Sequence, residues 1–305
     1  MHSLLLLYGC LISILTGIST EQATNSKRLV VNPHNFKYRL NSPEICSRGS
    51  DVLLWIHSSP DHFRNRIFIR NTWGNPKNFI GNHHRKVSLV FFLGMSTNKT
   101  VQVAVEYERE LYNDIVQETF LDSYQNLTYK AIMGCKWTSH YCKSAAMIVK
   151  TDDDAFVDTT SLFNIIDKMR SEGRFFYNTL LCHVWSHSAV RRSGKWKVTL
   201  EEYSEKFYPP YCSGLGLAMT ADLPMRLYKA SLQEPFFWID DAYLTGFLGQ
   251  RLNVTFENLA DRYNIRSSMV SRDTKQDFDS FIFYHTTELA KHNTDKLLHQ
   301  FYDVK

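Results

Sequence analysis

The sequence has little net charge of either sign. Its 35 lysine and arginine residues nearly balance 31 aspartate and glutamate residues, which leaves a formal charge of +4 over 305 residues. No run reaches five or six like charges, so the charge pattern gives no reason to expect nucleic acid as a partner. Apolar residues make up 44% of the chain and aromatic residues 14%, which excludes a disordered or fibrous protein.

Internal repeats, low-complexity tracts and glycine- or serine-rich linkers are also missing, so nothing divides the chain into parts. Its length allows one large or two ordinary domains, and either can bury a substantial core. The sequence contains no CxxC pair and no HExxH motif, and a zinc site therefore has no support. We expect one large α/β domain.

Long hydrophobic runs are scarce, and the apolar stretch near the start, residues 4–18, is short. As a helix it spans about 22 Å, against about 30 Å for a bilayer core. It is typical of a signal peptide cut after Ser19, and a short signal anchor is the alternative. Lys27 and Arg28 follow the stretch, which is the wrong side for an anchor under the positive-inside rule. In both cases residues 1–20 target the chain, and the rest faces the secretory lumen.

Sequons for N-glycosylation agree with a luminal location, and they begin at Asn98, Asn126 and Asn253. The cysteines beyond residue 20 are odd in number, so at most two disulfides form and one thiol remains: Cys46, Cys135, Cys142, Cys182 and Cys212. Cys135 and Cys142 are expected on one helix, about 10.5 Å apart, which is beyond the limit of about 7 Å for a disulfide.

Residues 21–45 are polar and lack periodicity, which indicates a stem, and the folded domain is expected over 46–305. Its first half alternates buried strands with amphipathic helices. The strands are expected at 51–56, 87–93 and 145–149, and the helices at 61–72, with Ser59 as N-cap before Pro60, at 98–112 and at 125–141. This alternation favours a layered α/β domain with a mainly parallel mixed sheet.

The second half is less regular. We expect a helix at 159–170, a strand at 174–181, a loop entering an apolar strand at 208–219, a helix from a Thr220 cap to Leu232, a short helix at 240–248 and a strand at 281–284.

Three consecutive carboxylates, Asp152, Asp153 and Asp154, follow the apolar strand at 145–149. Open α/β sheets place their ligands at the carboxyl ends of strands. Carboxylates suit Mg²⁺ or Mn²⁺, and such an ion can stabilise a departing diphosphate. The alternative is a solvated turn that caps the helix beginning at Thr159.

Five further polar positions are candidates. Arg66 and Arg70 stand four residues apart and share one helical face, where they can hold phosphate or simply face water. Asp240 and Asp241 follow an aromatic run, and a carboxylate beside apolar surface is a suitable general base or an N-cap. His285 is a candidate metal ligand or an ordinary packed histidine.

Several blocks occur in an order and at spacings that resemble the beta-1,3-galactosyltransferase family. They are RNRIFIRNTWG (64–74), VFFLG (90–94), ETFLDSYQNLTYK (118–130), KTDDDAFV (150–157), YPPYCSGLG (208–216) and DDAYLTG (240–246). The resemblance covers about 46–292. It implies a GT-A glycosyltransferase fold, Rossmann-like and layered, a UDP-sugar donor, a divalent cation (Mn²⁺, or Mg²⁺), and inversion at the sugar carbon. It also implies a single-pass type II protein of the Golgi membrane with a luminal catalytic domain. The alternative is a cleaved signal peptide, which would leave a soluble luminal protein.

Matching positions imply roles for individual residues. Asp241 resembles the base that deprotonates the acceptor hydroxyl. Asp154, His285 and Asp152 resemble the metal site, with Asp152 nearer the donor. The resemblance places the UDP-sugar against Arg66, Arg70, Lys130, Asp152, Asp153, Tyr211, Ser213, Gly214 and Asp240.

The chain differs from the family pattern at two places that bear on the donor. Asp240 stands where the family usually has glutamate, and Gly214-Leu215-Gly216-Leu217 replaces a glycine triplet followed by tyrosine. We expect transfer of galactose from UDP-galactose to a glycan hydroxyl in beta-1,3 linkage. The alternatives are transfer of N-acetylglucosamine and a glycan-binding pseudoenzyme of the same fold. The acceptor is expected on a glycoprotein or glycolipid.

Overall fold

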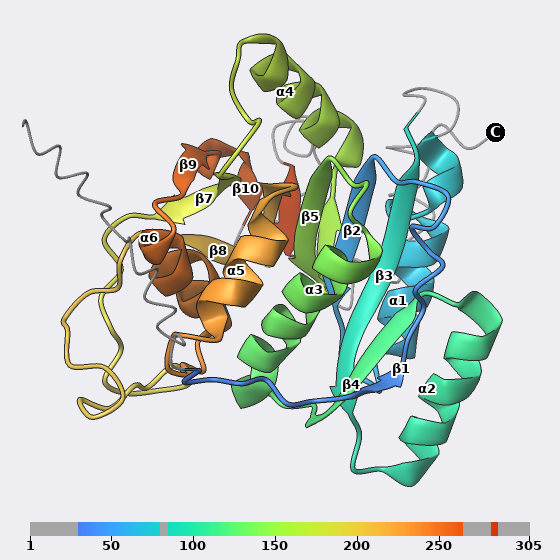
Figure 1. The fold of residues 1–305 in the computed structure, drawn as a ribbon, viewed down its shortest axis with the longest axis horizontal. Helices are drawn as coiled ribbons and strands as arrows, with labels where there is room; N and C mark the ends of the chain where they lie inside the picture. The colour runs from blue at the N-terminus through green and yellow to red at the C-terminus, as the bar shows by residue number, and fades with distance from the viewer. Residues whose placement is uncertain (1–29, 80–84, 265–281, 286–305) are drawn as a thin grey trace, which may run out of the picture.

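The computed structural model describes residues 30–79, 85–264 and 282–285, which form a layered α/β domain (Figure 1). An eight-stranded sheet lies at its centre. In spatial order its strands are β1 (Tyr38–Leu40), β4 (Ile115–Leu121), β3 (Val87–Met95), β2 (Val52–His57), β5 (Met147–Asp152), β8 (Tyr211–Thr220), β7 (Thr179–Trp185) and β9 (Thr255–Asn258).

Strands β4, β3, β2 and β5 run parallel, and β9 runs parallel to β7. β8 is antiparallel to both β5 and β7, and β1 is antiparallel to β4. Because β8 runs opposite to β5, the start of β8 lies at the same edge of the sheet as the end of β5. The predicted mixed, mainly parallel sheet is confirmed.

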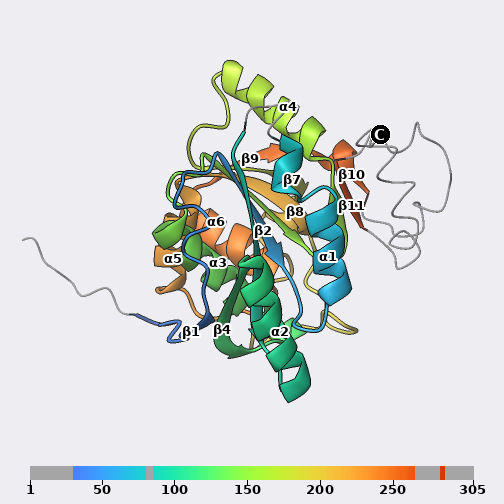
Figure 2. The same ribbon diagram turned by 90° about the vertical axis from the view of Figure 1, so that its right-hand side faces the viewer.

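Helices cover both faces of the sheet, as parallel strands require. They are α1 (Phe63–Asn71), α2 (Lys99–Tyr112), α3 (Leu127–Tyr141), α4 (Thr159–Ser171), α5 (Leu223–Ser231), the π-helix η3 (Ala242–Phe247) and α6 (Leu248–Arg251), with short 3₁₀ turns at η1 (Pro76–Phe79), η2 (Tyr124–Asn126) and η4 (Ala260–Arg262). The two perpendicular views place α3, α5 and α6 on one face and α1 on the other (Figures 1 and 2).

A second, three-stranded sheet consists of β10 (Tyr263–Asn264), β11 (Phe283–His285) and β6 (Ala155–Val157). It packs against β8 where Gly216 has no side chain: a Cβ there would lie 2.3 Å from the ring of Phe283. β11 pairs antiparallel with β6, which sets His285 opposite Ala155. The turn between β5 and β6 is thereby held beside the end of β11.

Most of the expected elements are confirmed within a few residues, and the strand expected at 174–181 is shifted to 179–185. Gly173, Phe175 and Asn178 all have positive φ, at 75°, 58° and 54°. Left-handed backbone cannot continue a strand, so the extended segment begins only at Thr179. The apolar strand expected after a loop within 208–219 is confirmed as β8, which begins already at Tyr211 and leaves little loop, and the short helix at 240–248 is split into η3 and α6.

Two predicted caps are wrong. The N-cap of α1 is His62, without a side-chain bond, and Ser59 donates to Asp61 Oδ1 at 2.6 Å instead. Thr220 belongs to β8, and α5 has Asp222 as its N-cap. The turn at 152–154 does not cap α4 either, because Asp158 does, by accepting from Ser161 N at 3.0 Å.

Strands β1, β4, β6, β9 and β10 were not expected from the sequence. β4 reads IVQETFL, and its Gln117 and Glu118 are fully buried. Glu118 accepts from Lys136 Nζ at 2.8 Å and lies 2.6 Å from His34 Nε2. Buried polar groups with partners are tolerated inside a sheet, but they break the apolar run that identifies a strand.

The segment expected as a stem is part of the domain from about residue 31 onward. Val31 N bonds Leu232 O at 2.9 Å beside α5, Phe36 packs on Phe120 and Tyr129, and β1 joins the sheet edge. The folded part therefore begins before Cys46.

The disulfides join Cys46 to Cys142 and Cys182 to Cys212, and Cys135 is a buried free thiol. This confirms two bridges and one spare thiol, with no bond between Cys135 and Cys142. Across the described ranges, no helix is long and apolar enough to span a bilayer. The apolar stretch at 4–18 and the start of the strand expected at 281–284 lie outside these ranges.

The contact between α3 and β2 depends on Gly134. A Cβ at this position would lie 2.0 Å from Trp55 Cζ2, and Trp55 is fully buried. We expect Gly134→Ala to lower the free energy of unfolding by at least about 1–3 kcal/mol, because the added methyl group overpacks the core against Trp55. This loss should exceed the gain from the higher helix propensity of alanine. Gly249→Ala in α6 is the control, because its Cβ would meet only side-chain ends, Val254 Cγ2 at 3.0 Å and Phe256 Cζ at 3.9 Å. Equal urea midpoints for the two variants would contradict this packing.

Candidate active site

A cavity of about 460 Å³ opens at the sheet edge where β5 ends and β8 begins. Its floor and walls come from these strand ends, from the start of η3 and from the long β7–β8 connection at 186–210. The lining residues are Tyr124, Leu127, Asp152, Trp185, Ser188, Ala189, Arg191, Trp196, Tyr208, Tyr211, Ser213, Gly214, Trp238, Ile239, Asp240 and Asp241.

Aromatic side chains dominate the walls of this cavity. Trp196, on the 186–210 connection, donates its indole N–H to Tyr124 Oη at 2.6 Å and so closes one side. Trp238 contacts Tyr124 edge-on, with ring centroids 6.3 Å apart. Large rings with polar tips provide flat apolar surface together with hydrogen-bonding groups. Such walls suit a sugar ring, which has apolar faces and hydroxyls at its edge.

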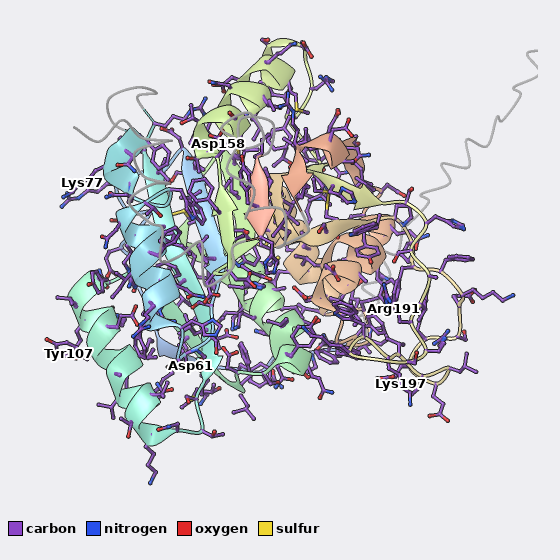
Figure 3. All side chains as sticks on the ribbon, turned by 180° about the vertical axis from the view of Figure 1, so that it is seen from behind. Asp61, Lys77, Tyr107, Asp158, Arg191 and Lys197 are labelled. Carbon is purple, nitrogen blue, oxygen red and sulfur yellow. A yellow bond between two sulfur atoms is a disulfide. The ribbon has the colours of Figure 1, made fainter. Side chains whose placement is uncertain are left out.

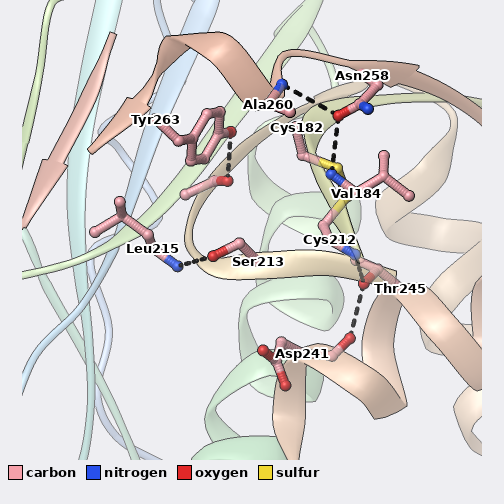
Figure 4. Close-up of a disulfide and its surroundings, with 11 residues drawn as sticks. Cys182, Val184, Cys212, Ser213, Leu215, Asp241, Thr245, Asn258, Ala260 and Tyr263 are labelled. Atoms are coloured by element: carbon pink, nitrogen blue, oxygen red, sulfur yellow. Dashed lines mark hydrogen bonds between the residues drawn. A yellow bond between two sulfur atoms is a disulfide. The ribbon is translucent and has the colours of Figure 1, made fainter. Parts of the chain in front are cut away.

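Asp241 is fixed by bonds that connect it to β8. It is the N-cap of η3, and its Oδ1 accepts from Ala242 N at 2.8 Å. Its carbonyl accepts from Thr245 Oγ1 at 2.7 Å, and that hydroxyl accepts from Cys212 N at 2.9 Å (Figure 4). Because Cys212 is disulfide-bonded to Cys182 in β7, two strands and a helix end hold the Asp241 backbone in place.

The environment of the Asp241 carboxyl favours proton uptake. Burial, reinforced by the neighbouring charge of Asp240, raises its pKa to about 7, although the bond from Ala242 N opposes the shift. A Cβ at Gly214 would lie 3.4 Å from Asp241 Oδ2, so the glycine leaves room beside this oxygen. A carboxyl that titrates near neutral pH and faces a cavity is suited to general base catalysis.

Lys150 supplies the positive charge beneath these acids. Its ammonium is buried, 3.6 Å from Asp240 Oδ2 and 4.0 Å from Asp152 Oδ1. Burial alone lowers the pKa of Lys150, but nearby carboxylates, led by Asp240, outweigh burial and raise it. The site therefore carries a permanent cation under its carboxylates.

Asp152 faces the cavity from the end of β5. Its Oδ1 lies 3.7 Å from the Nδ1 of buried His57. Neither ring nitrogen of His57 has a hydrogen-bond partner among the described residues, and burial holds its pKa well below the usual value, so the ring is neutral. Burial and the adjacent acids raise the pKa of Asp152, against the opposing effect of Lys150.

Asp153 points away from the cavity. Its carboxylate accepts from Ser58 Oγ at 2.6 Å and Asn65 Nδ2 at 3.2 Å, and lies 3.0 Å from His62 Nδ1. Burial opposes ionisation, but the bonds from His62 and Ser58 dominate and hold its pKa below the usual range. This acid of the triplet ties the β5–β6 turn to the start of α1.

Asp154 and His285 form a separate pair, with Asp154 Oδ2 3.4 Å from His285 Nε2. Neither lines the cavity. Within residues 30–79, 85–264 and 282–285, no group of three or more His, Cys, Asp or Glu side chains is arranged to hold a metal. The predicted set of three metal ligands is therefore split, because Asp152 lies with the cavity acids.

The basic residues expected at the nucleotide are bound to protein groups. Arg66 is fully buried, and it donates to Glu108, Ser58 Oγ and two carbonyls of the β2–α1 loop. Arg70 pairs with Glu108 and Asp114 at 2.6 and 2.7 Å.

Lys130 is likewise committed, since it donates to Ser58 O at 2.6 Å and lies 2.9 Å from Asp122 Oδ2. In contrast, Tyr211, Ser213 and Gly214 all line the cavity as expected, and the Tyr211 hydroxyl lies 3.0 Å from Ser188 Oγ.

Sequence reasoning missed Lys150, His57 and the aromatic walls. A lysine inside the buried run MIVKTD was a usable signal, because lysine is almost never fully buried without a partner. Trp185 and Trp196 gave none, since Trp185 ends β7 beyond the expected strand and Trp196 lies in the irregular connection that follows. The sequon residues Asn98 and Asn253 are exposed, and Asn126 is half-buried beside the cavity residue Leu127.

Comparison with known proteins places these residues in a family. The family model described as galactosyltransferase matches residues 64–260. Beta-1,3-galactosyltransferase 1 of Mus musculus and of Homo sapiens is 33% identical over 222 residues, covering 72% of this chain and 67% of theirs. Beta-1,3-galactosyltransferase 2 of Homo sapiens is 34% identical over 216 residues, covering 70% of this chain and 50% of its own.

Solved structures show a more distant likeness. Galactosyltransferase LgtC in complex with donor and acceptor sugar analogues has a TM-score of 0.40 at 12% identity, covering 83% of this chain and 97% of that one. A glycosyltransferase involved in glycosylating the major capsid of PBCV-1 has a TM-score of 0.42 at 9% identity, covering 81% and 98%.

The bonds of Arg66 and Arg70 predict a structural role for Glu108, which accepts from both guanidinium groups. We expect Glu108→Gln to lower the free energy of unfolding by about 3–5 kcal/mol, because a buried charge loses its partner. Glu106→Gln on the same helix removes an exposed pair with Arg39 and is expected to cost less than about 1 kcal/mol. Urea unfolding of both variants measures the difference, and equal losses would contradict the burial argument.

Proposed function

This chain belongs to the galactosyltransferase family and is a hexosyltransferase, and from that premise we propose the reaction that its site carries out. The proposed reaction moves galactose from UDP-galactose to a hydroxyl of an acceptor glycan in beta-1,3 linkage, with inversion at the sugar carbon. The observation that carries the proposal is Asp241, a carboxyl with a raised pKa held at the wall of an aromatic cavity.

The chemistry is a single displacement. The acceptor oxygen forms a bond to the anomeric carbon of the donor sugar, and the bond from that carbon to the diphosphate oxygen breaks. UDP leaves with the electron pair, and Asp241 takes the proton of the attacking hydroxyl. Attack on the face opposite the leaving group inverts the anomeric centre.

The neighbouring groups orient the two sugars in this proposal. Asp240 and Asp152 accept hydrogen bonds from donor hydroxyls, and the Lys150 ammonium lies 3.6 Å from Asp240 and 4.0 Å from Asp152. Tyr211, Ser213 and Gly214 flank the sugar. We assign Asp153, Arg66, Arg70 and Lys130 to holding the frame of the site, since each already has several protein partners.

A divalent cation fits the Asp154–His285 pair. Asp154 and His285 would hold the ion, because one carboxylate oxygen and one imidazole nitrogen suit Mn²⁺. When bound there, the cation supplies positive charge to the departing diphosphate.

We also propose that the domain works in the secretory lumen, as a Golgi protein held by residues 1–20 or released from them. Two disulfides in the described chain support an oxidising compartment.

Asp241→Asn tests the base directly. Asparagine is nearly isosteric and cannot take the proton, so we expect transfer to fall at least about 10²-fold with UDP affinity within a few-fold of wild type. In wild type the base must be ionised, so kcat should fall as pH drops below about 7 and level off above it. Product formation and UDP calorimetry measure the two effects.

Asp240→Asn is the matched control. We expect it to change KM or donor choice between UDP-galactose and UDP-N-acetylglucosamine more than kcat. Full activity of Asp241→Asn with an inactive Asp240→Asn would assign the base to Asp240, and no hydrolysis or transfer of either donor would overturn the proposed reaction.

The metal proposal predicts that turnover requires a divalent ion. Asp154→Asn and His285→Gln should each weaken Mn²⁺ binding, measured by electron paramagnetic resonance in the presence of UDP, and lower turnover about 10²-fold. Asp158→Asn, at the cap of α4, is the control and should bind Mn²⁺ normally. Undiminished activity in EDTA would remove the metal from the mechanism.

A further inference from the structure

The connection between β7 and β8, residues 186–210, is irregular in secondary structure but internally braced. The guanidinium of Arg192 donates to four carbonyls of the same segment, those of Val198, Thr199, Tyr203 and Glu205, at 2.7–3.0 Å. Backbone bonds join Val190 to Lys206 and Tyr208 to Ser188. This bracing fixes the cavity wall that the segment forms, before any ligand binds.

Arg191, next to the bracing arginine, faces the other way and lines the cavity. Its side chain is exposed, and its guanidinium lies over the ring of Trp196, 5.4 Å from the centroid. Within the described chain the guanidinium makes no hydrogen bond and no ion pair. Trp196 is itself held by Tyr124, so Arg191 is supported from below while its donors remain available.

The charges around the cavity are unevenly distributed. The acids that line it are Asp152, Asp240 and Asp241, and Lys150 compensates them from beneath. Arg191 is the one cation among the lining residues in the described part of the chain. Tyr211 also lines the cavity, and its hydroxyl lies 3.0 Å from Ser188 Oγ on the connection that carries Arg191. The cation and the proposed base Asp241 therefore line one cavity but belong to different segments of the chain.

We propose that Arg191 and Trp196 form an anion subsite beside the acceptor hydroxyl, and that the acceptor is an acidic glycan. Its carboxylate or sulfate binds Arg191 while a sugar ring stacks on the aromatic wall and presents its hydroxyl to Asp241. This inference rests on the proposed function, because it concerns the acceptor of that reaction.

The donor diphosphate is the other anion that could bind Arg191, and the geometry favours the acceptor. The group proposed to receive the diphosphate is the Asp154–His285 pair, and neither residue lines the cavity. Arg191 instead lies on the connection that carries Trp196 and Ser188. A guanidinium stacked on an indole binds planar or tetrahedral oxyanions through paired N–H groups.

The test compares acceptors that differ by one acidic group. Disaccharides are supplied in neutral, carboxylate and sulfate forms to wild type, Arg191→Gln and Arg191→Lys. For wild type we expect kcat/KM about tenfold higher for the acidic forms, mainly through KM, as for one charge-assisted contact. Arg191→Gln should reduce this preference to about twofold or less, because kcat/KM falls more for the acidic forms than for the neutral one, and Arg191→Lys should restore part of it.

Lys197→Gln is the matched control, because Lys197 is an exposed cation of the same connection that does not line the cavity (Figure 3). It should keep the wild-type preference. The inference is overturned if wild type uses neutral and acidic acceptors equally, or if Arg191→Gln retains the preference. It is also overturned if Arg191→Gln mainly raises KM for the UDP-sugar in hydrolysis without acceptor, which would assign the anion to the diphosphate.

A binding measurement separates this inference from the proposed reaction. Saturation-transfer NMR with the same disaccharides, without donor, reports the acidic preference when no turnover occurs. Binding that depends on Arg191 without hydrolysis or transfer would reject the reaction and keep the subsite. Transfer to neutral acceptors with no acidic preference would keep the reaction and reject the subsite.

Discussion

One buried ammonium, that of Lys150, makes the acidic site possible. Carboxylates that face a confined space repel one another and resist ionisation unless a cation is near. Lys150 reaches Asp240 and Asp152 from inside the sheet, where solvent cannot screen it. Asp241 lies one residue from Asp240, and burial, reinforced by the charge of Asp240 and opposed by Lys150, raises its pKa to about 7. The buried lysine therefore offsets the mutual repulsion of the acids at the cavity, and burial places the pKa of Asp241 near neutral pH.

Buried charged side chains that are paired with polar partners also hold the elements around the site in place. Asp153 anchors the β5–β6 turn to the start of α1, and Arg66 joins the β2–α1 loop to α2 through Glu108. Three consecutive aspartates thus have three positions: one at the cavity, one in the frame and one beside His285. Asp152 ends β5, whereas Asp153 and Asp154 form the turn before β6, so three consecutive carboxylates need not share one direction or form one metal cluster.

The sequence predicted the layered fold because its central strands, such as VLLWIH, are continuous apolar runs. It failed for β4, whose buried Glu118 and Gln117 resemble surface residues until their partners in other elements are known. It also missed the aromatic cavity. Tyr124 lies far from Trp185 and Trp196 in the chain, and only the tertiary fold brings them together. Single acids at strand and helix ends were predictable, while their surroundings were not.

We expect the irregular connection at 186–210 to determine which acceptor the site binds. The floor of the cavity is built from strand ends and a helix cap, where a shift of any backbone would disturb the sheet, the Cys182–Cys212 bond and Thr245 together. The wall carrying Arg191 and Trp196 has its own bracing through Arg192, and its shape therefore does not depend on the sheet register. Substitutions on this wall can change which glycan is bound without moving the base. Acceptor choice is accordingly expected to lie in the connection, and proton transfer in the rigid edge of the sheet.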